Sequence, residues 1–329
     1  MQTRPFGRSG LNLSVLGFGC GAVGGLMVRG TAADQERAIT RAIAAGINYF
    51  DTAAQYGDGQ SETNLGRAIR TLKLRDLTIG TKVRLRHTTG IREAIVSSLD
   101  DSLRRLALPQ VDIFHLHNAI TARGGDAALT ADQVLGDVVP TFEMLRQQGK
   151  IRFGGITAVG ESAALRKVAE ARVIGSAQVV FNLLNPSSAA PVAADYPGQN
   201  FEELLKLNAA CGIGSIAIRI LGGGALSGTA ARQPNASPAP APIGSSQSFD
   251  GDLALAQKFS PLVADGTVTS LTELAIRYAI TEPNVGTALI GLASQSDLET
   301  AIGSVEKGPL PREVLARVAA IQAGLAPSS

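Results

Sequence analysis

Four residues of types that transfer protons occur in order along the chain, in or just after apolar runs: Asp51, Tyr56, Lys82 and His117. Asp51 and Tyr56 belong to the stretch GINYFDTAAQYGDGQSETNLGR, where the acid ends a strand-like run and the phenol lies in a glycine-bounded loop. Lys82 closes the run DLTIGTK, and His117 closes VDIFHLH. If the fold brings these positions together, an acid, a phenol, an amine and an imidazole share one site.

The chemistry of such a site follows from the pKa values of its members. A free tyrosine has a pKa of about 10, and the ammonium of Lys82 is expected to lower that of Tyr56. Asp51 would hold Lys82 charged, and a neutral His117 would donate a hydrogen bond to a carbonyl oxygen. The set would polarise a C=O group and move a proton to or from its oxygen. A redox reaction there also needs a hydride source, which indicates a nicotinamide cofactor.

The elements that must position these residues repeat along the chain. An apolar run, a polar residue at its end and an amphipathic segment recur, which is typical of βα units with a parallel sheet. Strands are predicted over 16–19 and near Asn48, Ile79, Ile113, Gly155, Val179, Ile216 and Ala288. Helices are predicted at positions that include 34–45, 91–106, 252–259, 271–280 and 312–323. The expected fold is α/β, a (β/α)8 TIM barrel with an N-terminal β-hairpin turning at 8–10 and extra C-terminal helices. The strand ends of such a barrel share one face.

The composition agrees with one globular domain over residues 1–329. The chain has 329 residues, of which 45% are hydrophobic and 18% charged, which suffices for a large core. Its net charge of +2, in well-mixed signs, predicts a small-molecule partner rather than nucleic acid or a membrane, and leaves the oligomeric state open. Cys20 and Cys211 form no C-x-x-C pair and the N-terminus lacks a signal-peptide core, so a cytoplasmic location is expected.

Residues 231–248, ARQPNASPAPAPIGSSQS, depart from the rest of the chain in composition. They are rich in Ala, Pro and Ser and can bury little apolar surface, so a flexible loop after the seventh strand is expected. A long loop on the active face of a barrel is often a lid, and a disordered spacer is the alternative.

The sequence resembles the aldo-keto reductases from SVLGFGCG to IGLASQSDLETA. The family pattern G-x-N-x-x-D-T-A-x-x-Y-G with a following S-E-x-x-L-G appears as GINYFDTAAQYG and SETNLG, its T-K as Thr81 and Lys82, and its V-D-x-x-x-x-H as VDIFHLH. The resemblance implies that Asp51, Tyr56, Lys82 and His117 form a catalytic tetrad. It implies an NAD(P)-dependent oxidoreductase that interconverts an aldehyde, ketone or sugar with an alcohol. Tyr56 would be the general acid in reduction and the general base in oxidation.

The resemblance also implies cofactor contacts, several of which depart from the family pattern. Thr157 keeps the hydroxyl of the usual Ser-Asn pair, but Ala158 loses the amide. Gln178 matches a glutamine that grips the nicotinamide carboxamide, and Ile218 replaces a stacking aromatic residue. Arg219 and the glycine backbone after it suit a pyrophosphate. The expected cofactor residues are Cys20, Gly21, Asp51, Thr157, Gln178, Ile218, Arg219, Leu221, Gly222, Gly224, Gly291, Ser294 and Asp297.

Asp297 bears on the choice between NAD and NADP. It lies in the segment that resembles the family's adenosine-binding sequence, at a position where a neutral or basic residue is common. A carboxylate there would repel a 2′-phosphate and accept a hydrogen bond from a 2′-hydroxyl. The family usually prefers NADP, and Asp297 predicts tolerance of NAD.

Three other interpretations arise from the same sequence. Residues 19–24, GCGAVG, spell the G-x-G-x-x-G of a Rossmann fold, although no helix opens on these glycines. His115 and His117 form an H-x-H pair like that of metal-dependent barrel hydrolases, but His87 is the only other histidine and no metal is expected. The third is a cofactor-holding regulatory or binding protein of the same fold without significant turnover.

These motifs do not identify the substrate. Substrate contacts in this fold come from loops after the strands. Met27, Arg84 and His87 lie in such loops and are candidate substrate contacts. The physiological direction of the reaction is likewise left open.

Overall fold

Eight parallel strands form a closed barrel in the computed structural model, which describes residues 1–125 and 127–325. Positions 126 and 326–329 of the predicted 1–329 domain lie outside the described residues. The order around the barrel is β10-β11-β12-β3-β4-β5-β6-β9, so neighbours in sequence are neighbours in space. The strands are β3 (Leu16–Gly19), β4 (Tyr49–Asp51), β5 (Thr78–Val83), β6 (Val111–Leu116), β9 (Ile151–Ala158), β10 (Ser176–Val180), β11 (Gly214–Ile218) and β12 (Thr287–Gly291). The predicted TIM barrel is confirmed, and its closed parallel sheet excludes the Rossmann interpretation.

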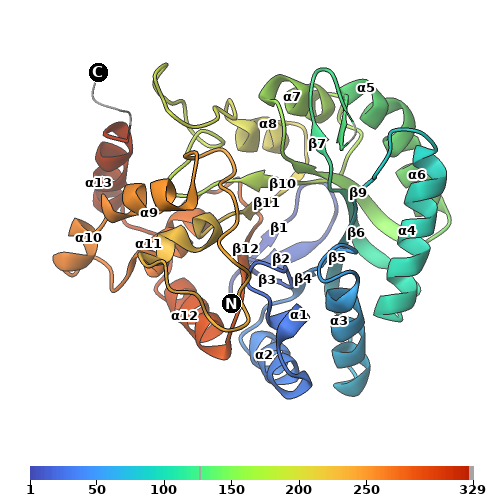
Figure 1. Cartoon of the computed structure of the whole chain (residues 1–329), viewed down its shortest axis with the longest axis horizontal. Coiled ribbons are helices and arrows are strands. Elements are labelled where there is room, and N and C mark those ends of the chain that lie inside the picture. The colour runs from blue at the N-terminus through green and yellow to red at the C-terminus, as the bar shows by residue number, and fades with distance from the viewer. Residues whose placement is uncertain (126, 326–329) are drawn as a thin grey trace.

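Helices surround the barrel (Figure 1). The longer ones that follow strands are α2 (Ala32–Ala44), α3 (Gln60–Thr71), α4 (Ile91–Leu106), α6 (Val139–Gln147), α7 (Ser162–Glu170), α8 (Leu204–Ala210), α11 (Leu271–Thr281) and α12 (Gln295–Glu306). Short elements between them are α1 (Leu26–Arg29), β7 (Ala119–Ile120), β8 (Ala128–Leu129), α5 (Ala131–Gln133), the π-helical η1 (Val134–Val138) and the 3-10 helix η2 (Gly222–Ser227). The helix α2 begins after Thr31, whose side chain accepts a hydrogen bond from the Asp34 backbone nitrogen.

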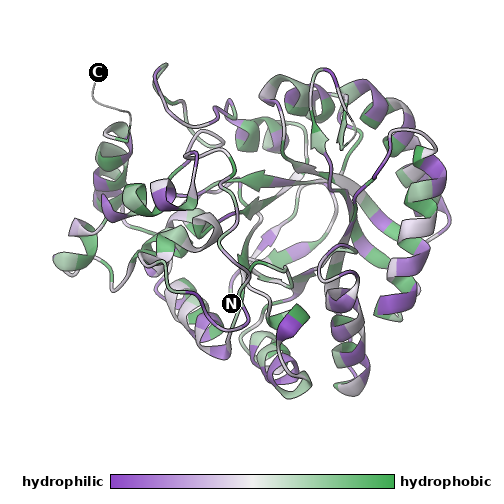
Figure 2. Cartoon of the chain, viewed as in Figure 1, coloured by the Kyte–Doolittle hydropathy of each residue, from purple (hydrophilic) through white to green (hydrophobic). Residues whose placement is uncertain are grey.

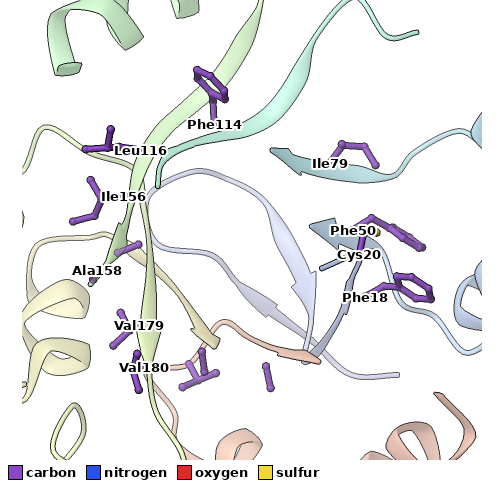
Figure 3. Close-up of a cluster of buried hydrophobic side chains, with 14 of the residues drawn as sticks. Phe18, Cys20, Phe50, Ile79, Phe114, Leu116, Ile156, Ala158, Val179 and Val180 are labelled. Carbon is purple, nitrogen blue, oxygen red and sulfur yellow. The ribbon is translucent and has the colours of Figure 1, made fainter. Parts of the chain in front are cut away.

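The main core lies between the strands and these helices. Apolar side chains on the outer surface of the barrel strands, such as Phe18, Phe50, Phe114 and Val179, pack there (Figure 3). The rings of Phe18 and Phe50 lie 5.2 Å apart, which joins β3 to β4. The outer helices carry both hydrophobic and hydrophilic residues, as helices with one face on a barrel should (Figure 2). This packing fixes the strands, and with them the side chains at the strand ends.

A hairpin closes the floor of the barrel. β1 (Thr3–Pro5) pairs antiparallel with β2 (Asn12–Ser14), which confirms the predicted N-terminal hairpin. Phe6 follows β1, is fully buried and belongs to a small cluster with Tyr49, Ile113 and Ile216. Gly214 is needed beside it, because a Cβ there would lie 2.6 Å from the Phe6 ring. The site at the other end of the barrel is thus sealed from below.

The predicted extra helices are present, and they contribute to a second hydrophobic core beside the barrel. They are α9 (Phe249–Gln257), the short α10 (Pro261–Ala264) and α13 (Arg312–Ala323), which lie together on one side of the molecule (Figure 1). α9 begins three residues before the predicted helix, because Ser248 accepts a hydrogen bond from Gly251 and caps it. Among the described residues, no helix is both long and apolar enough to cross a membrane.

Candidate active site

Asp51, Tyr56, Lys82 and His117 lie together at the carboxyl ends of three neighbouring strands. Asp51 is the last residue of β4, Lys82 lies near the end of β5 and His117 follows β6 directly. Tyr56 lies in the loop between β4 and α3. The Lys82 ammonium is fully buried and donates hydrogen bonds to the Asp51 carboxylate, to the Thr52 carbonyl at 2.8 Å and to the Tyr56 hydroxyl at 3.3 Å.

Asp51 and Lys82 form a buried ion pair. Burial opposes the charge on Lys82, but the Asp51 carboxylate and the Tyr56 phenol outweigh it and raise the pKa of the ammonium. The second carboxylate oxygen of Asp51 accepts hydrogen bonds from the Tyr49 hydroxyl at 2.7 Å and the Gln178 amide at 2.8 Å. Because both partners are held by neighbours on rigid strands, Lys82 presents a fixed positive charge to Tyr56.

The pKa of Tyr56 departs from the expectation of a lowered value. Burial of the phenol raises its pKa, Lys82 lowers it, and Asp51 raises it again, so the net shift is upward. The sequence-based expectation counted the ammonium but not the burial that comes with it. Tyr56 is therefore a protonated phenol at neutral pH, the form that a general acid needs.

His117 is neutral for a comparable reason. Burial lowers its pKa to about 3, with further contributions from the positive charges of Lys82 and Arg84. Its ring meets that of Tyr56 edge to face, with centroids 5.9 Å apart. The Gln55 amide nitrogen lies 2.6 Å from Nδ1 of His117. A neutral imidazole and a protonated phenol thus stand together above a buried ammonium.

His115 is held by the barrel interior. It is buried, and its Nε2 lies 2.8 Å from the Ser176 hydroxyl on a strand two places around the barrel. Over residues 1–125 and 127–325, no group of three or more His, Cys, Asp or Glu side chains is placed to hold a metal ion. The hydrolase interpretation therefore has no ligand set in that part of the chain.

A cleft of about 1010 Å³ opens above the four residues and extends past β11 to the start of α12. The expected cofactor residues that line it are Gly21, Asp51, Thr157, Gln178, Ile218, Arg219, Leu221, Gly224, Gly291 and Asp297. Cys20, Gly222 and Ser294 lie next to lining residues without lining the cleft themselves. Cys20 is buried, and Ser294 caps α12 by accepting a hydrogen bond from the Asp297 nitrogen. Ala158 is buried in the core and leaves Thr157 to face the cleft.

The middle of the cleft suits the phosphates of a dinucleotide. Gly223 and Gly224 have φ values of 70° and 115°, where a side chain would be strained, so the backbone lies bare. A Cβ on Gly223 would lie 3.1 Å from Arg219 Nη1, and one on Gly224 would lie 2.6 Å from Arg232 Nη1. Two positively charged guanidinium groups beside an open glycine turn are chemically suited to a pyrophosphate. The residues present therefore fit a nicotinamide dinucleotide.

Asp297 stands at the far end of the cleft, in the first turn of α12. One of its carboxylate oxygens accepts hydrogen bonds from the backbone nitrogens of Ala293 at 2.9 Å and Ser294 at 3.0 Å. The side chain therefore forms a capping box with Ser294 and also lines the cleft. Its negative charge is held at a fixed position by the helix start.

Of the three candidate substrate contacts, the structure contradicts Met27 and places His87 outside the cleft lining. Met27 is 1% exposed and packs into the main core, because the apolar face of α1 turns toward the barrel. His87 is exposed and does not line the cleft. Arg84 does line it, beside His117. The sequence reasoning missed Gln55 and Arg232, although Gln55 directly precedes Tyr56 in the quoted motif.

The segment 231–248 runs along the cleft without forming a helix or strand. Arg232 donates hydrogen bonds to the carbonyls of Gly223 and Ser237. Asn235 donates to the carbonyl of Ala293 at 3.0 Å, and the Ser237 nitrogen donates to that of Val23. The segment thus connects the loop after β11 with the loops after β12 and β3.

Comparison with known proteins agrees with this geometry. The sequence model described as "Aldo/keto reductase family" matches residues 15–323. L-galactose dehydrogenase from Arabidopsis thaliana is 27% identical over 329 residues, covering 98% of this chain and 94% of the relative. A putative voltage-gated potassium channel subunit beta from Schizosaccharomyces pombe is 28% identical over 325 residues, covering 92% and 88%. The holo form of aldo-keto reductase AKR11C1 from Bacillus halodurans has a TM-score of 0.72 at 25% identity, covering 98% of this chain and 96% of that chain.

The family match spans nearly the whole barrel, and the structural similarity extends over both chains. The catalytic residues expected from the resemblance also meet at one strand-end face. On these grounds the chain belongs to the aldo-keto reductase family of oxidoreductases.

Proposed function

We propose that the protein is an NAD(P)-dependent oxidoreductase that interconverts a carbonyl and an alcohol, with Tyr56 as the general acid or base. The observation that carries the proposal is the contact of the Tyr56 hydroxyl with the buried Lys82 ammonium, 3.3 Å away at the floor of a dinucleotide-sized cleft. A bound nicotinamide supplies or takes up the hydride. The protein then has only to move one proton at the substrate oxygen.

In reduction, the Tyr56 hydroxyl gives its proton to the carbonyl oxygen as the carbonyl carbon gains a hydride. The phenolate left behind is stabilised by Lys82, whose charge is maintained by Asp51. His117 is neutral and donates a hydrogen bond to the same oxygen, which spreads the developing negative charge. In oxidation the proton travels the other way, from the alcohol to a Tyr56 phenolate.

For the cofactor, Thr157 and Gln178 would hold the nicotinamide end, with the Thr157 hydroxyl donating to the Gln178 amide oxygen at 3.3 Å. Arg219 and Arg232 would hold the pyrophosphate, and Asp297 would face the adenosine ribose. A carboxylate at that place disfavours a 2′-phosphate. We therefore propose that NADH is accepted alongside NADPH. Binding of NADPH a hundredfold tighter than NADH would contradict this.

The substrate class remains aldehydes, ketones and sugars. The relative named L-galactose dehydrogenase makes L-galactose and other aldoses the first compounds to assay. Both cysteines are free and buried, in keeping with a reducing cytoplasm, where we propose that the enzyme works. We further propose that residues 1–329 fold as one domain and that the 231–248 segment opens and closes over the bound cofactor.

The test is a screen of carbonyls and sugars with NADH and NADPH separately, followed by Tyr56→Phe in the best assay. We expect the substitution to leave the Kd for the cofactor nearly unchanged and to lower kcat by about a thousandfold, because it removes only the proton donor. Tyr196→Phe is the matched control, since the Tyr196 hydroxyl bonds the Leu184 carbonyl away from the cleft. Undiminished turnover in Tyr56→Phe would remove Tyr56 from the mechanism.

The alternative of a cofactor-holding regulatory protein is supported by the relative named as a potassium channel subunit beta. The complete set of four catalytic residues favours an enzyme. A wild-type protein that binds NADPH or NADH but turns over none of the screened compounds would favour the regulatory role instead.

A further inference from the structure

Gln55 occupies a position that the proposed chemistry does not yet use. It lies between β4 and Tyr56, lines the cleft together with His117, and contacts that ring directly. The contact joins Gln55 Nε2 to His117 Nδ1 over 2.6 Å. An amide nitrogen can donate a hydrogen bond but cannot accept one, so Nδ1 must be the acceptor.

The protonation state of the ring then fixes where its proton lies. His117 is neutral, so it carries one ring proton, and an Nδ1 that accepts leaves that proton on Nε2. The groups that face the ring reinforce the neutral form. Lys82 and Arg84 repel a positive charge on it, and Tyr56 and His115 are uncharged.

The other end of the Gln55 amide supports the same orientation. Its Oε1 is buried and has no hydrogen-bond partner among the residues that the structure describes. Turning the amide over would place the NH2 group in that spot and leave its donors unpartnered. Buried donors without partners are rarer than under-satisfied carbonyl oxygens. The observed orientation is therefore the favoured one.

We propose that Gln55 is a positioning residue that selects the Nε2–H tautomer of His117, so that Nε2 donates to the substrate oxygen beside Tyr56. The effect on catalysis rests on the proposed function, whereas the choice of tautomer rests only on the contact between Gln55 and His117. Without Gln55, the ring would divide between two tautomers, and the one with a bare Nε2 would repel the substrate oxygen.

The tautomer can be measured without any substrate. The chain has only three histidines, so long-range ¹H–¹⁵N spectra of ring-labelled protein contain three signal sets, with His87→Gln assigning one of them. We expect His117 to show the Nε2–H pattern in the wild type and a mixture of patterns in Gln55→Met. An Nδ1–H pattern in the wild type, or an unchanged Nε2–H pattern in Gln55→Met, would overturn the proposal.

Gln55→Glu gives the sharpest kinetic test, because a carboxylate only accepts. It would draw a proton onto Nδ1 and stabilise the imidazolium, which still donates through Nε2. We expect kcat for reduction to be retained at low pH and to fall at least about tenfold as the ring loses its Nε2 proton at higher pH. The wild type should stay flat between about pH 6 and about pH 9.

Gln60→Glu is the matched control, since it adds the same charge five residues away, where Gln60 bonds only Asn64 among the described side chains. Gln55→Met should lower kcat about tenfold while the Kd for cofactor is unchanged. A Gln55→Glu profile as flat as that of Gln60→Glu would refute the role of Gln55. A wild type without turnover would refute the proposed function, and the spectra would still decide the tautomer.

Discussion

At the proposed catalytic end of the cleft, Asp51 and Lys82 lie on neighbouring strands and are almost fully buried, with several hydrogen bonds each. At the proposed cofactor end, Arg219 directly follows β11, Arg232 lies in the 231–248 segment, and Asp297 lies in the first turn of α12. Side chains on packed strands cannot change without disturbing the barrel, whereas loops and helix ends tolerate exchange. We therefore propose that the proton-transfer residues on the strands tolerate few substitutions, whereas the cofactor-binding residues on loops and at the helix start tolerate more.

The residues that depart from the family pattern lie at or near the proposed cofactor end of the cleft. Asp51, Tyr56, Lys82 and His117 all match the pattern: Lys82 is hydrogen-bonded to Asp51 and Tyr56, and the ring of His117 packs against that of Tyr56. Ala158, Ile218 and Asp297, which depart from it, lie at or near the cofactor side. If this difference between the two ends is physical, substitutions at the two ends should also differ in their energetic cost.

The largest effect is expected for Lys82→Met, which removes half of the buried ion pair. The Asp51 carboxylate would be left buried without its cation, which costs about 3–5 kcal/mol of unfolding free energy. Turnover should also fall about a thousandfold, because nothing then stabilises the Tyr56 phenolate. Urea unfolding and steady-state kinetics measure both.

Lys150→Met is the control for this change, since Lys150 pairs with Asp100 at 2.6 Å on the partly exposed surface. Such a pair is worth at most about 1 kcal/mol. If the two variants unfold at the same urea concentration, the buried pair does not distinguish the catalytic end.

The raised pKa of Tyr56 should give the two reaction directions opposite pH dependences. Because burial raises the pKa of Tyr56 above its ordinary value of 10.0, the phenol stays protonated through neutral and moderately basic pH. The reduction rate should therefore be level there and fall only in strong base, as the proton donor is lost. The oxidation rate needs the phenolate and should rise about tenfold per pH unit below that pKa. Rates measured in both directions, over a pH range where the protein stays folded, test the sign. A reduction rate that falls near neutrality would show a lowered pKa instead.

The positions of Asp51 and Lys82 could be predicted from the sequence because both residues lie on barrel strands. Apolar runs of strand length fix where Asp51 and Lys82 lie, and the shared face of a parallel barrel brings the strand ends together. The net pKa shift of Tyr56 was not predictable in the same way. It depends on how deeply the phenol is buried, and a sequence pattern carries no measure of that depth.

The contacts made by the loops around the cleft were harder to predict, because they depend on how distant segments fold together. Arg232 reaches the cleft only because the 231–248 segment folds back along it, and no short-range pattern specifies such a path. Met27 was predicted to lie in an open loop, but it belongs to the one-turn helix α1 and lies on the buried face of that helix. Gln55 lies inside a recognised motif, but its bond to His117 spans 62 positions.

A smaller effect is expected at the glycine turn. Arg219→Met should weaken binding of NADH and NADPH alike by about tenfold, because a phosphate loses one charge-assisted partner. The kcat at saturating cofactor should remain unchanged, since Arg219 is not part of the proton path. Fluorescence titration gives the Kd values, and Arg37→Met on the surface is the control. A loss of kcat without a change in Kd would show that Arg219 acts in catalysis, and would contradict the proposed separation of catalytic and cofactor-binding residues.

The smallest effect should come from Asp297→Asn, which removes a charge while keeping the side chain's size. We expect NADPH to bind up to about tenfold more tightly, because only the 2′-phosphate is repelled by the carboxylate. NADH should bind nearly as before, because the Asn amide oxygen can still accept a hydrogen bond from a 2′-hydroxyl. Asp34→Asn is the matched control, since Asp34 holds the equivalent third position of α2, outside the cleft. If both substitutions leave the ratio of the two Kd values unchanged, the Asp297 carboxylate serves α12 alone. Asp297 would then not determine the choice between NADH and NADPH, and the set of cofactor-binding residues that tolerate substitution would be smaller than proposed.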